Sequence, residues 1–176
     1  SVKNNLAGSL HCSQKAIVEM SFEGKSVLIT GAASGIGLAC AHAFAKLGAL
    51  VTMADLNGDV LAGKASELVA QGCDIATIVA DISDPDACAN MVSQAIASFG
   101  RLDVAVNNAA MPTPIGGLFE DFPIALWRRV IDVNLNGLFY AMRAEVPALK
   151  AAGGGAIVNT ASVASLVAAK GMPAYV

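Results

Sequence analysis

The sequence has few charged and aromatic residues, and each shortage excludes a class of protein. Only 14% of its 176 residues are charged and 5% are aromatic, whereas 55% are hydrophobic. A disordered chain needs a larger share of charge, so a folded domain with one buried core is expected. The formal net charge of −3 provides no basic surface for nucleic acid or for an anionic membrane, so we predict neither as a partner.

Metal-binding side chains are also scarce. The only histidines are His11 and His42, and the four cysteines are isolated along the chain: Cys12, Cys40, Cys73 and Cys88. We therefore predict no metal site, because isolated cysteines in an apolar chain are typical of small buried hydrophobic residues. Such cysteines favour a reducing compartment, and we expect a cytoplasmic protein. The longest uncharged run, Val27 to Ala45, contains polar residues and glycines, which favours a strand, a turn and a buried helix over a membrane span.

The first nineteen residues, Ser1–Glu19, differ from the rest because they are polar and lack strong hydrophobic periodicity. We interpret Met20 as the native start and residues 1–19 as an N-terminal extension or a cloning remnant. An ordered extension is the alternative. Residues 20–176 form the predicted domain.

From Lys25 onward, short apolar runs alternate with helical stretches. The predicted strands are Ser26–Thr30, Leu50–Ala54, Ile75–Ala80, Leu102–Val106 and Ala156–Asn159, and the predicted helices are Ile36–Leu47, Val60–Ala70, Ser83–Phe99 and a long one over Ile124–Lys150. Pro147 is expected to kink or end the last helix nearby. This alternation predicts an α/β fold, a doubly wound parallel sheet of the Rossmann type, whose ligands bind at the carboxyl ends of the strands.

The first predicted strand leads into a glycine-rich turn, Thr30 to Gly37. Three glycines at the start of a helix let backbone amides and the positive end of the helix dipole approach a pyrophosphate closely. No Gly-Lys-Ser/Thr follows, which excludes a Walker loop, and Ala32 replaces the first glycine of a nucleophile elbow. The turn is predicted to bind a dinucleotide through Gly31, Ser34, Gly35, Ile36 and Gly37. A glycine-rich turn without a ligand is the alternative.

An acidic residue follows the second predicted strand. Asp55 stands 24 residues after Gly31, where a carboxylate can accept hydrogen bonds from the hydroxyls of the adenosine ribose. The 2′-phosphate of NADP would meet a like charge there, and no arginine or lysine lies in the glycine turn or directly after Asp55. We therefore predict NAD as the cofactor, with a solvated loop carboxylate as the alternative.

With these residues the chain resembles the short-chain dehydrogenase/reductase family in its single-domain form. Thr30, Gly31, Gly35, Ile36 and Gly37 match the TGxxxGxG turn of that family. The resemblance implies that Asp81 and Ile82 contact the adenine and that Asn108 and Ala109, within a match to the NNAG motif, border the cofactor. Ala110 replaces the glycine of that motif, which puts close backbone approach at this position in doubt.

The resemblance also implies a set of catalytic residues. Asn134 matches an asparagine that helps hold a water in a proton relay, Ser162 the catalytic serine, and Tyr175, thirteen residues later, the catalytic tyrosine. In the family a lysine four residues after the tyrosine completes the site, whereas this sequence ends at Val176. We therefore expect that the domain is incomplete at its C-terminal end and that these residues alone are not an active enzyme.

The implied activity is hydride transfer between NAD and a secondary alcohol or ketone, with Tyr175 as general acid and base. A dinucleotide-binding module without turnover, or an inactive fragment, is the alternative. The long helix from Ile124 is apolar on more than one face, and the resemblance implies that it packs against its copy in a homodimer or homotetramer. Burial against its own sheet is the alternative.

Overall fold

The computed structural model describes residues 21–113, 118–167 and 172–175. The predicted N-terminal extension, residues 1–19, therefore lies outside the described residues, as does Met20.

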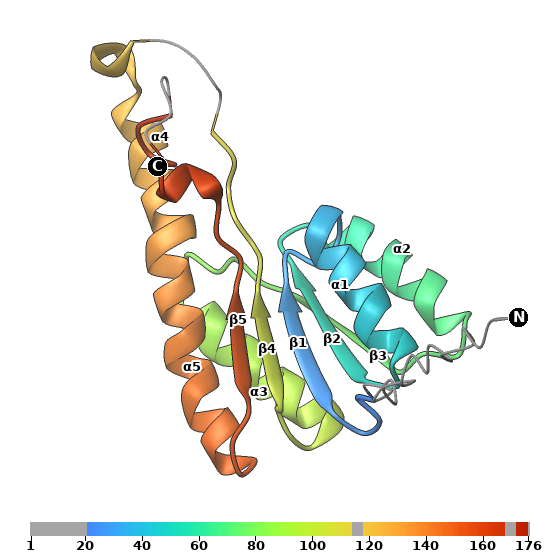
Figure 1. The fold of residues 1–176 in the computed structure, drawn as a ribbon. Helices are drawn as coiled ribbons and strands as arrows, with labels where there is room; N and C mark the ends of the chain where they lie inside the picture. Colours follow the sequence, from blue (N-terminus) through green and yellow to red (C-terminus); the bar gives the residue numbers. More distant parts are fainter. Residues whose placement is uncertain (1–20, 114–117, 168–171, 176) are drawn as a thin grey trace, which may run out of the picture.

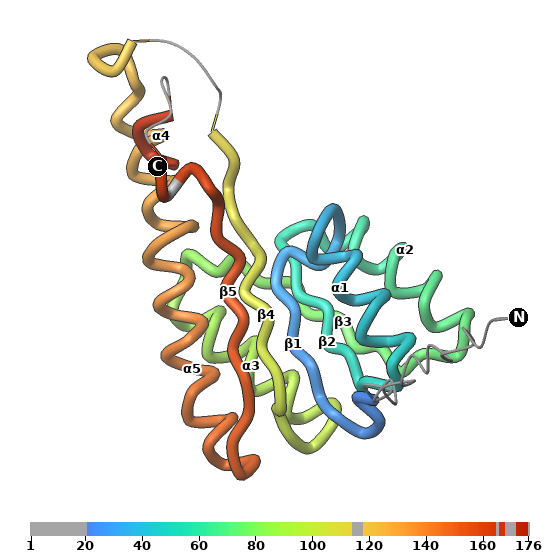
Figure 2. Tube along the Cα trace, in the orientation of Figure 1, coloured from blue at the N-terminus to red at the C-terminus, as the bar shows by residue number. Residues whose placement is uncertain are grey.

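Five parallel strands form one sheet in the order β3-β2-β1-β4-β5. The strands are β1 (Ser26–Thr30), β2 (Leu50–Asp55), β3 (Ile75–Val79), β4 (Val104–Asn107) and β5 (Ala156–Asn159). All carboxyl ends lie at one edge of the sheet, from which the segments after β4 and β5 both leave (Figure 2). This order and direction confirm the predicted doubly wound α/β fold.

Helices cover both faces of the sheet (Figure 1). One face carries α1 (Gly35–Lys46) and α2 (Gly58–Val69), and the other carries α3 (Pro85–Phe99) and α5 (Leu138–Ala151). Alternate residues of β1 supply both cores: Val27 and Ile29 pack toward α1, whereas Leu28 packs toward α3. A strand buried on both faces favours apolar residues on both sides, and residues 27–29 are Val, Leu and Ile, with buried Ser26 and Thr30 at the two ends.

The long helix predicted over Ile124–Lys150 differs from the prediction at its centre. It comprises α4 (Ile124–Ile131), a π-helical segment η2 (Asp132–Gly137) and α5. Gly137 approaches the loop after β3 so closely that a Cβ there would lie 2.9 Å from the carbonyl oxygen of Ile82. The helix ends at Ala151, one turn after the proline that was expected to disturb it.

Among the residues that the structure describes, no helix is both long and apolar enough to cross a membrane. The same residues contain no cluster of three or more histidine, cysteine, aspartate or glutamate side chains that could hold a metal ion.

Candidate dinucleotide-binding and active site

The glycine turn between β1 and α1 depends on two left-handed backbone positions. Gly31 has φ of +65° and Gly35 has φ of +54°, a region that side chains disfavour. A Cβ on Gly31 would lie 2.9 Å from the Cα of Ala109, and a Cβ on Gly37 would collide with the carbonyl oxygen of Gly31. The glycines therefore let the turn, the first turn of α1 and the loop after β4 pack against one another.

The N-terminus of α1 opens toward the turn without a neutralising group. Ser34 is the N-cap residue, but its side chain makes no capping hydrogen bond, and the first turn of α1 contains no acidic residue. Helix N-terminal amides and the helix dipole favour an anion at such a place. This arrangement suits the pyrophosphate of a dinucleotide.

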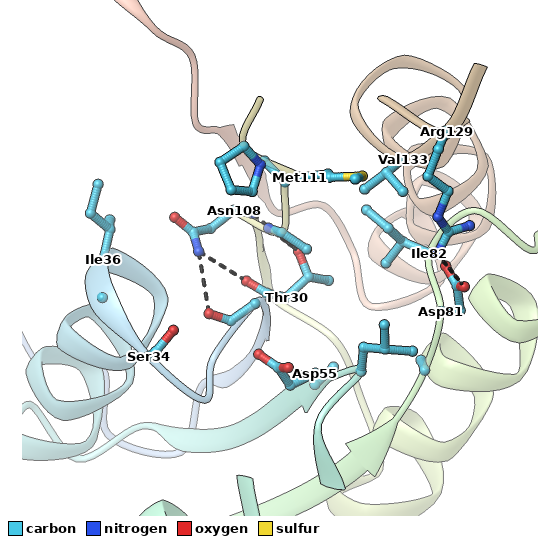
Figure 3. A pocket seen from close by; sticks show the side chains of 18 residues that line it. Thr30, Ser34, Ile36, Asp55, Asp81, Ile82, Asn108, Met111, Arg129 and Val133 are labelled. Carbon is cyan, nitrogen blue, oxygen red and sulfur yellow. Dashed lines mark hydrogen bonds and ion pairs between the residues drawn. The ribbon is translucent and has the colours of Figure 1, made fainter. Parts of the chain in front are cut away.

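Two side chains join the ends of β1 and β4 (Figure 3). The Thr30 hydroxyl accepts hydrogen bonds from the backbone amides of Asn108 (3.0 Å) and Ala109 (3.1 Å). The side-chain amide of Asn108 (Nδ2) in turn donates to the carbonyl oxygens of Thr30 (3.3 Å) and Gly31 (3.4 Å). The match to the NNAG motif thus holds the glycine turn in place from the neighbouring strand.

Asp55 lies at the carboxyl end of β2, beside the glycine turn. One carboxylate oxygen accepts from the backbone amide of Ala33 at 3.0 Å and the other from that of Asn57 at 2.9 Å. Each oxygen can accept a second hydrogen bond, and the carboxylate is only partly buried. Asp55 is therefore oriented by the backbone and still able to accept from the hydroxyls of a ribose.

The carboxyl end of β3 contributes a second oriented carboxylate. Asp81 accepts from the Ser83 amide (2.9 Å) and hydroxyl (2.6 Å), and Arg129 of α4 donates to Asp81 (2.9 Å) and to the Ser83 hydroxyl (2.8 Å). The hydrogen bond from the Ser83 side chain, joined by those of Arg129 and the Ser83 amide, keeps the pKa of Asp81 below its ordinary value despite partial burial. The carboxylate is therefore ionised and fixed in direction.

A pocket of about 770 Å³ is lined by the glycine turn and by the residues that follow β2, β3 and β4. Nine of the ten residues predicted to bind the cofactor line it: Gly31, Ser34, Gly35, Ile36, Asp55, Asp81, Ile82, Asn108 and Ala109. Gly37 instead packs behind the turn and is buried. Ala110 lines the pocket with an exposed side chain, so its methyl group does not fill the space between β1 and β4. The size and the closely packed glycines fit a dinucleotide.

The three residues proposed for catalysis lie beyond the carboxyl ends of β4 and β5. The Asn134 side chain accepts from the backbone amide of Met111 (2.7 Å) and donates to its carbonyl oxygen (3.1 Å). Ser162 is the N-cap of a short 3-10 turn, where its hydroxyl accepts from the Ala164 amide at 3.2 Å. Tyr175 is partly buried in a turn of residues 172–175. None of these three is among the described residues that line the pocket.

A model of the short-chain dehydrogenase family matches residues 25–176. The chain belongs to this family. A cyclohexanol dehydrogenase from Acinetobacter sp. (strain SE19) is 43% identical over 160 residues, which cover 91% of this chain and 63% of the relative. A trans-4-hydroxycyclohexanecarboxylate dehydrogenase from Sinomonas cyclohexanicum is 42% identical over 157 residues, which cover 86% of this chain and 60% of the relative.

Solved structures of this dehydrogenase family have the same fold. NAD⁺-bound xylitol dehydrogenase superimposes with a TM-score of 0.84 at 30% identity, covering 89% of this chain and 60% of the other. A short-chain dehydrogenase/reductase from Burkholderia phymatum in complex with NAD superimposes with a TM-score of 0.83 at 32% identity, covering 89% and 55%. The chain thus spans about three-fifths of the length of the relatives that it matches.

Two polar residues of this domain were not predicted from the sequence. Arg129 lines the pocket beside Val133, the two being four residues apart near the start of the long helix. Glu145 is fully buried although it lies on a helix. A signal existed for the second one, because Glu145 is an isolated acidic residue in a stretch where small and apolar residues recur.

Proposed function

We propose that the protein is an oxidoreductase that transfers a hydride between NAD(H) and a secondary alcohol or ketone. The observation that carries this proposal is the pocket that joins the glycine turn, the open N-terminus of α1 and the oriented Asp55 carboxylate. Membership of the short-chain dehydrogenase family and the NAD bound in two structural neighbours support a nicotinamide dinucleotide as the cofactor. The position of Asp55 favours NAD over NADP.

In this proposal the chain's own residues bind the cofactor and handle the proton. When bound, the nicotinamide supplies hydride acceptance and return. Tyr175 removes the hydroxyl proton of the alcohol, and Ser162 donates a hydrogen bond to the same oxygen and orients it. A phenol with an ordinary pKa of about 10 is a weak base at neutral pH, so a cation must stabilise the phenolate. The family resemblance assigns that role to a lysine four residues after Tyr175.

In this scheme Asn134 has a positioning role, because it holds the backbone of the loop after β4. Both polar atoms of its side chain bond the backbone of Met111, whose side chain lines the pocket next to Pro112. The asparagine thereby fixes the loop after β4 against the π-helical segment. The relay water implied by the resemblance would have to share the Asn134 amide with this contact or bind the helix backbone beside it.

The relatives suggest which alcohol to test first. Two of them are named for cyclohexane-ring alcohols, and we propose a cyclic secondary alcohol as the substrate class. The experiment measures NADH formation by the intact protein from NAD with cyclohexanol, trans-4-hydroxycyclohexanecarboxylate, xylitol and a primary alcohol. NADH with the two ring alcohols supports the proposal. NAD binding without NADH from any of the four would favour a dinucleotide-binding module without turnover.

Replacing Asp55 by serine is expected to reduce the preference for NAD over NADP by about 10- to 100-fold, or about 1.4–2.8 kcal/mol. The reason is that the like charge facing a 2′-phosphate is removed. Arg129, the cation that lines the pocket, is engaged by Asp81 and offers no ready partner to that phosphate. The measurement is the ratio of the dissociation constants of NAD and NADP.

The matched control is Asp59→Asn, which removes the same charge from the exposed first turn of α2. It is expected to leave the ratio unchanged. An Asp55→Ser variant with the same ratio as the parent protein would show that Asp55 does not select the cofactor.

We also propose that the protein is a homodimer or homotetramer that associates through α4, the π-helical segment and α5. Leu135 is 61% exposed and Phe139 is 62% exposed, and Ile124 and Trp127 of α4 are also exposed. Several large exposed apolar side chains on neighbouring helical segments favour an interface. Light scattering should give a multiple of the monomer mass, and the double variant Leu135→Ser/Phe139→Ser should shift it to the monomer. A monomeric mass for the parent protein contradicts this proposal.

A further inference from the structure

Glu145 is a charged residue type in the least accessible part of the molecule. Its side chain is 0% exposed in the layer between α5 and the sheet. One carboxyl oxygen, Oε2, accepts a hydrogen bond from Nδ2 of Asn107 at 3.0 Å. The other carboxyl oxygen, Oε1, has no partner, and neither does Oδ1 of the same Asn107. Glu145 and Asn107 are hydrogen-bonded to each other, and each therefore has a buried acceptor oxygen that lacks a donor.

The orientation of the Asn107 amide is settled by its neighbours. Its Nδ2 donates to Glu145 Oε2 and also to Oδ1 of Asn159 at 3.1 Å, which uses both of its hydrogens. A flipped amide would place an oxygen against two acceptors, because Asn159 uses its own Nδ2 to donate to the sulfur of Met142. Asn107 Oδ1 can therefore only accept a hydrogen bond, and a neighbouring group must carry the proton that is donated to it.

We propose that Glu145 is a positioning residue that is held as a neutral carboxylic acid, donating from Oε1 to Asn107 Oδ1 while Oε2 accepts from Asn107 Nδ2. This paired arrangement satisfies both orphan oxygens with one proton. It closes a network of four side chains: Glu145, Asn107, Asn159 and Met142.

The charges around Glu145 agree with a neutral acid. The titratable group that faces it from α3 is Cys88, and burial raises the pKa of that thiol to about 11, so it is neutral at physiological pH. The strands contribute the amides of Asn107 and Asn159, and Arg143 and Lys150, the bases of α5, are exposed. Burial likewise raises the pKa of Glu145, an effect that the hydrogen bond from Asn107 only partly opposes. An ionised carboxylate here would be buried without a cation among the groups that face it.

The network lies beneath both functional loops. Asn107 ends β4 immediately before Asn108, and its carbonyl oxygen accepts from the amide of Thr160 at 2.9 Å. Asn159 ends β5 three residues before Ser162. Glu145 therefore fixes the relative positions of the two strand ends from which the cofactor-binding loop and the serine loop depart.

The test compares Glu145→Gln with Glu145→Leu in the full chain. Glutamine keeps one acceptor and supplies N–H donors, so the paired arrangement survives. We expect Glu145→Gln to retain its melting temperature at neutral pH and its NAD affinity. Glu145→Leu has a similar volume but leaves the Asn107 amide unsatisfied, and we expect its NAD affinity to fall by about tenfold.

Two readouts separate a neutral acid from a merely buried side chain. The infrared spectrum of the parent protein at neutral pH should contain the carbonyl band of a protonated carboxylic acid, and this band should be missing in Glu145→Gln. The melting temperature of the parent should also fall relative to Glu145→Gln as the pH rises above the ordinary Glu value of 4.5. Stability from a raised pKa is complete below the unfolded-state pKa and is lost as the pH rises through the folded-state pKa.

The NAD readout rests on the proposed function, whereas the infrared and melting readouts do not. If no variant binds NAD, the proposed function fails, and the spectra still decide the protonation of Glu145. A parent protein without the acid band, or a Glu145→Gln variant as damaged in melting as Glu145→Leu, overturns the inference.

Discussion

Replacing Gly37 by alanine is expected to weaken NAD binding at least about a hundredfold, which corresponds to about 2.8 kcal/mol. The added Cβ would collide with the carbonyl oxygen of Gly31 and would lie 2.7 Å from Nδ2 of Asn108. The first of these atoms belongs to the backbone of the turn, so the clash is relieved only if the turn opens. Opening the turn separates the α1 amides from the place where the pyrophosphate is expected. Calorimetric titration with NAD measures the effect.

Gly63→Ala is the matched control, because it adds the same methyl group to a glycine of α2 that has nothing within 4 Å of its Cβ position. Removing a helix-interior glycine should stabilise the protein by about 0.5–1 kcal/mol and leave the NAD affinity unchanged. Circular dichroism establishes that both variants are folded. A folded Gly37→Ala variant that binds NAD as well as the parent would contradict the role assigned to the turn.

Replacing Tyr175 by phenylalanine is expected to lower the rate of hydride transfer by about 10²–10⁴-fold in the intact protein, while NAD binding is retained. The substitution removes the hydroxyl that is proposed to take the proton of the alcohol and keeps the ring. Tyr175 is not among the described residues that line the pocket, so we expect cofactor binding to be little affected. Single-turnover measurement of NADH formation isolates the chemical step from cofactor binding.

Tyr140→Phe is the control for this variant, since Tyr140 is the chain's other tyrosine. It lies on α5 with its ring centroid 5.9 Å from that of Phe139. Its hydroxyl has no role in the proposed mechanism, so the rate should not change. Unchanged turnover in Tyr175→Phe would refute Tyr175 as the general acid and base.

Local signals were sufficient for most of the fold. The run Ser26–Thr30 was predicted to the residue, because its centre, Val27 to Ile29, is apolar on both faces and a glycine-rich turn follows it directly. Pro85 lies in the first turn of α3, where its missing amide costs nothing. Gly48 follows α1 in the left-handed region, with φ of +84°. Each of these features depends on residues that are adjacent in the chain.

Features that depend on distant residues were not predicted. Arg129 reaches Asp81 across 48 residues, and Asn107 reaches Glu145 across 38. No periodicity specifies which carboxylate an arginine will meet or whether a glutamate faces the interior. The π-helical segment was missed for the same reason, because it accompanies contacts that Asn134 and Gly137 make with other loops.

The sequence by itself determined the succession of strands and helices along the chain and the glycine turn, since periodicity, capping and motif spacing are local properties. The resemblance to the family supplied the residues proposed for the proton. Only the tertiary structure decided how the site is supported: Arg129 on Asp81, Asn108 on the glycine turn, and Glu145 beneath the ends of β4 and β5. The physical reason is that a buried polar group must find its partner in space, and that partner is chosen by the packing of elements that lie far apart in the chain.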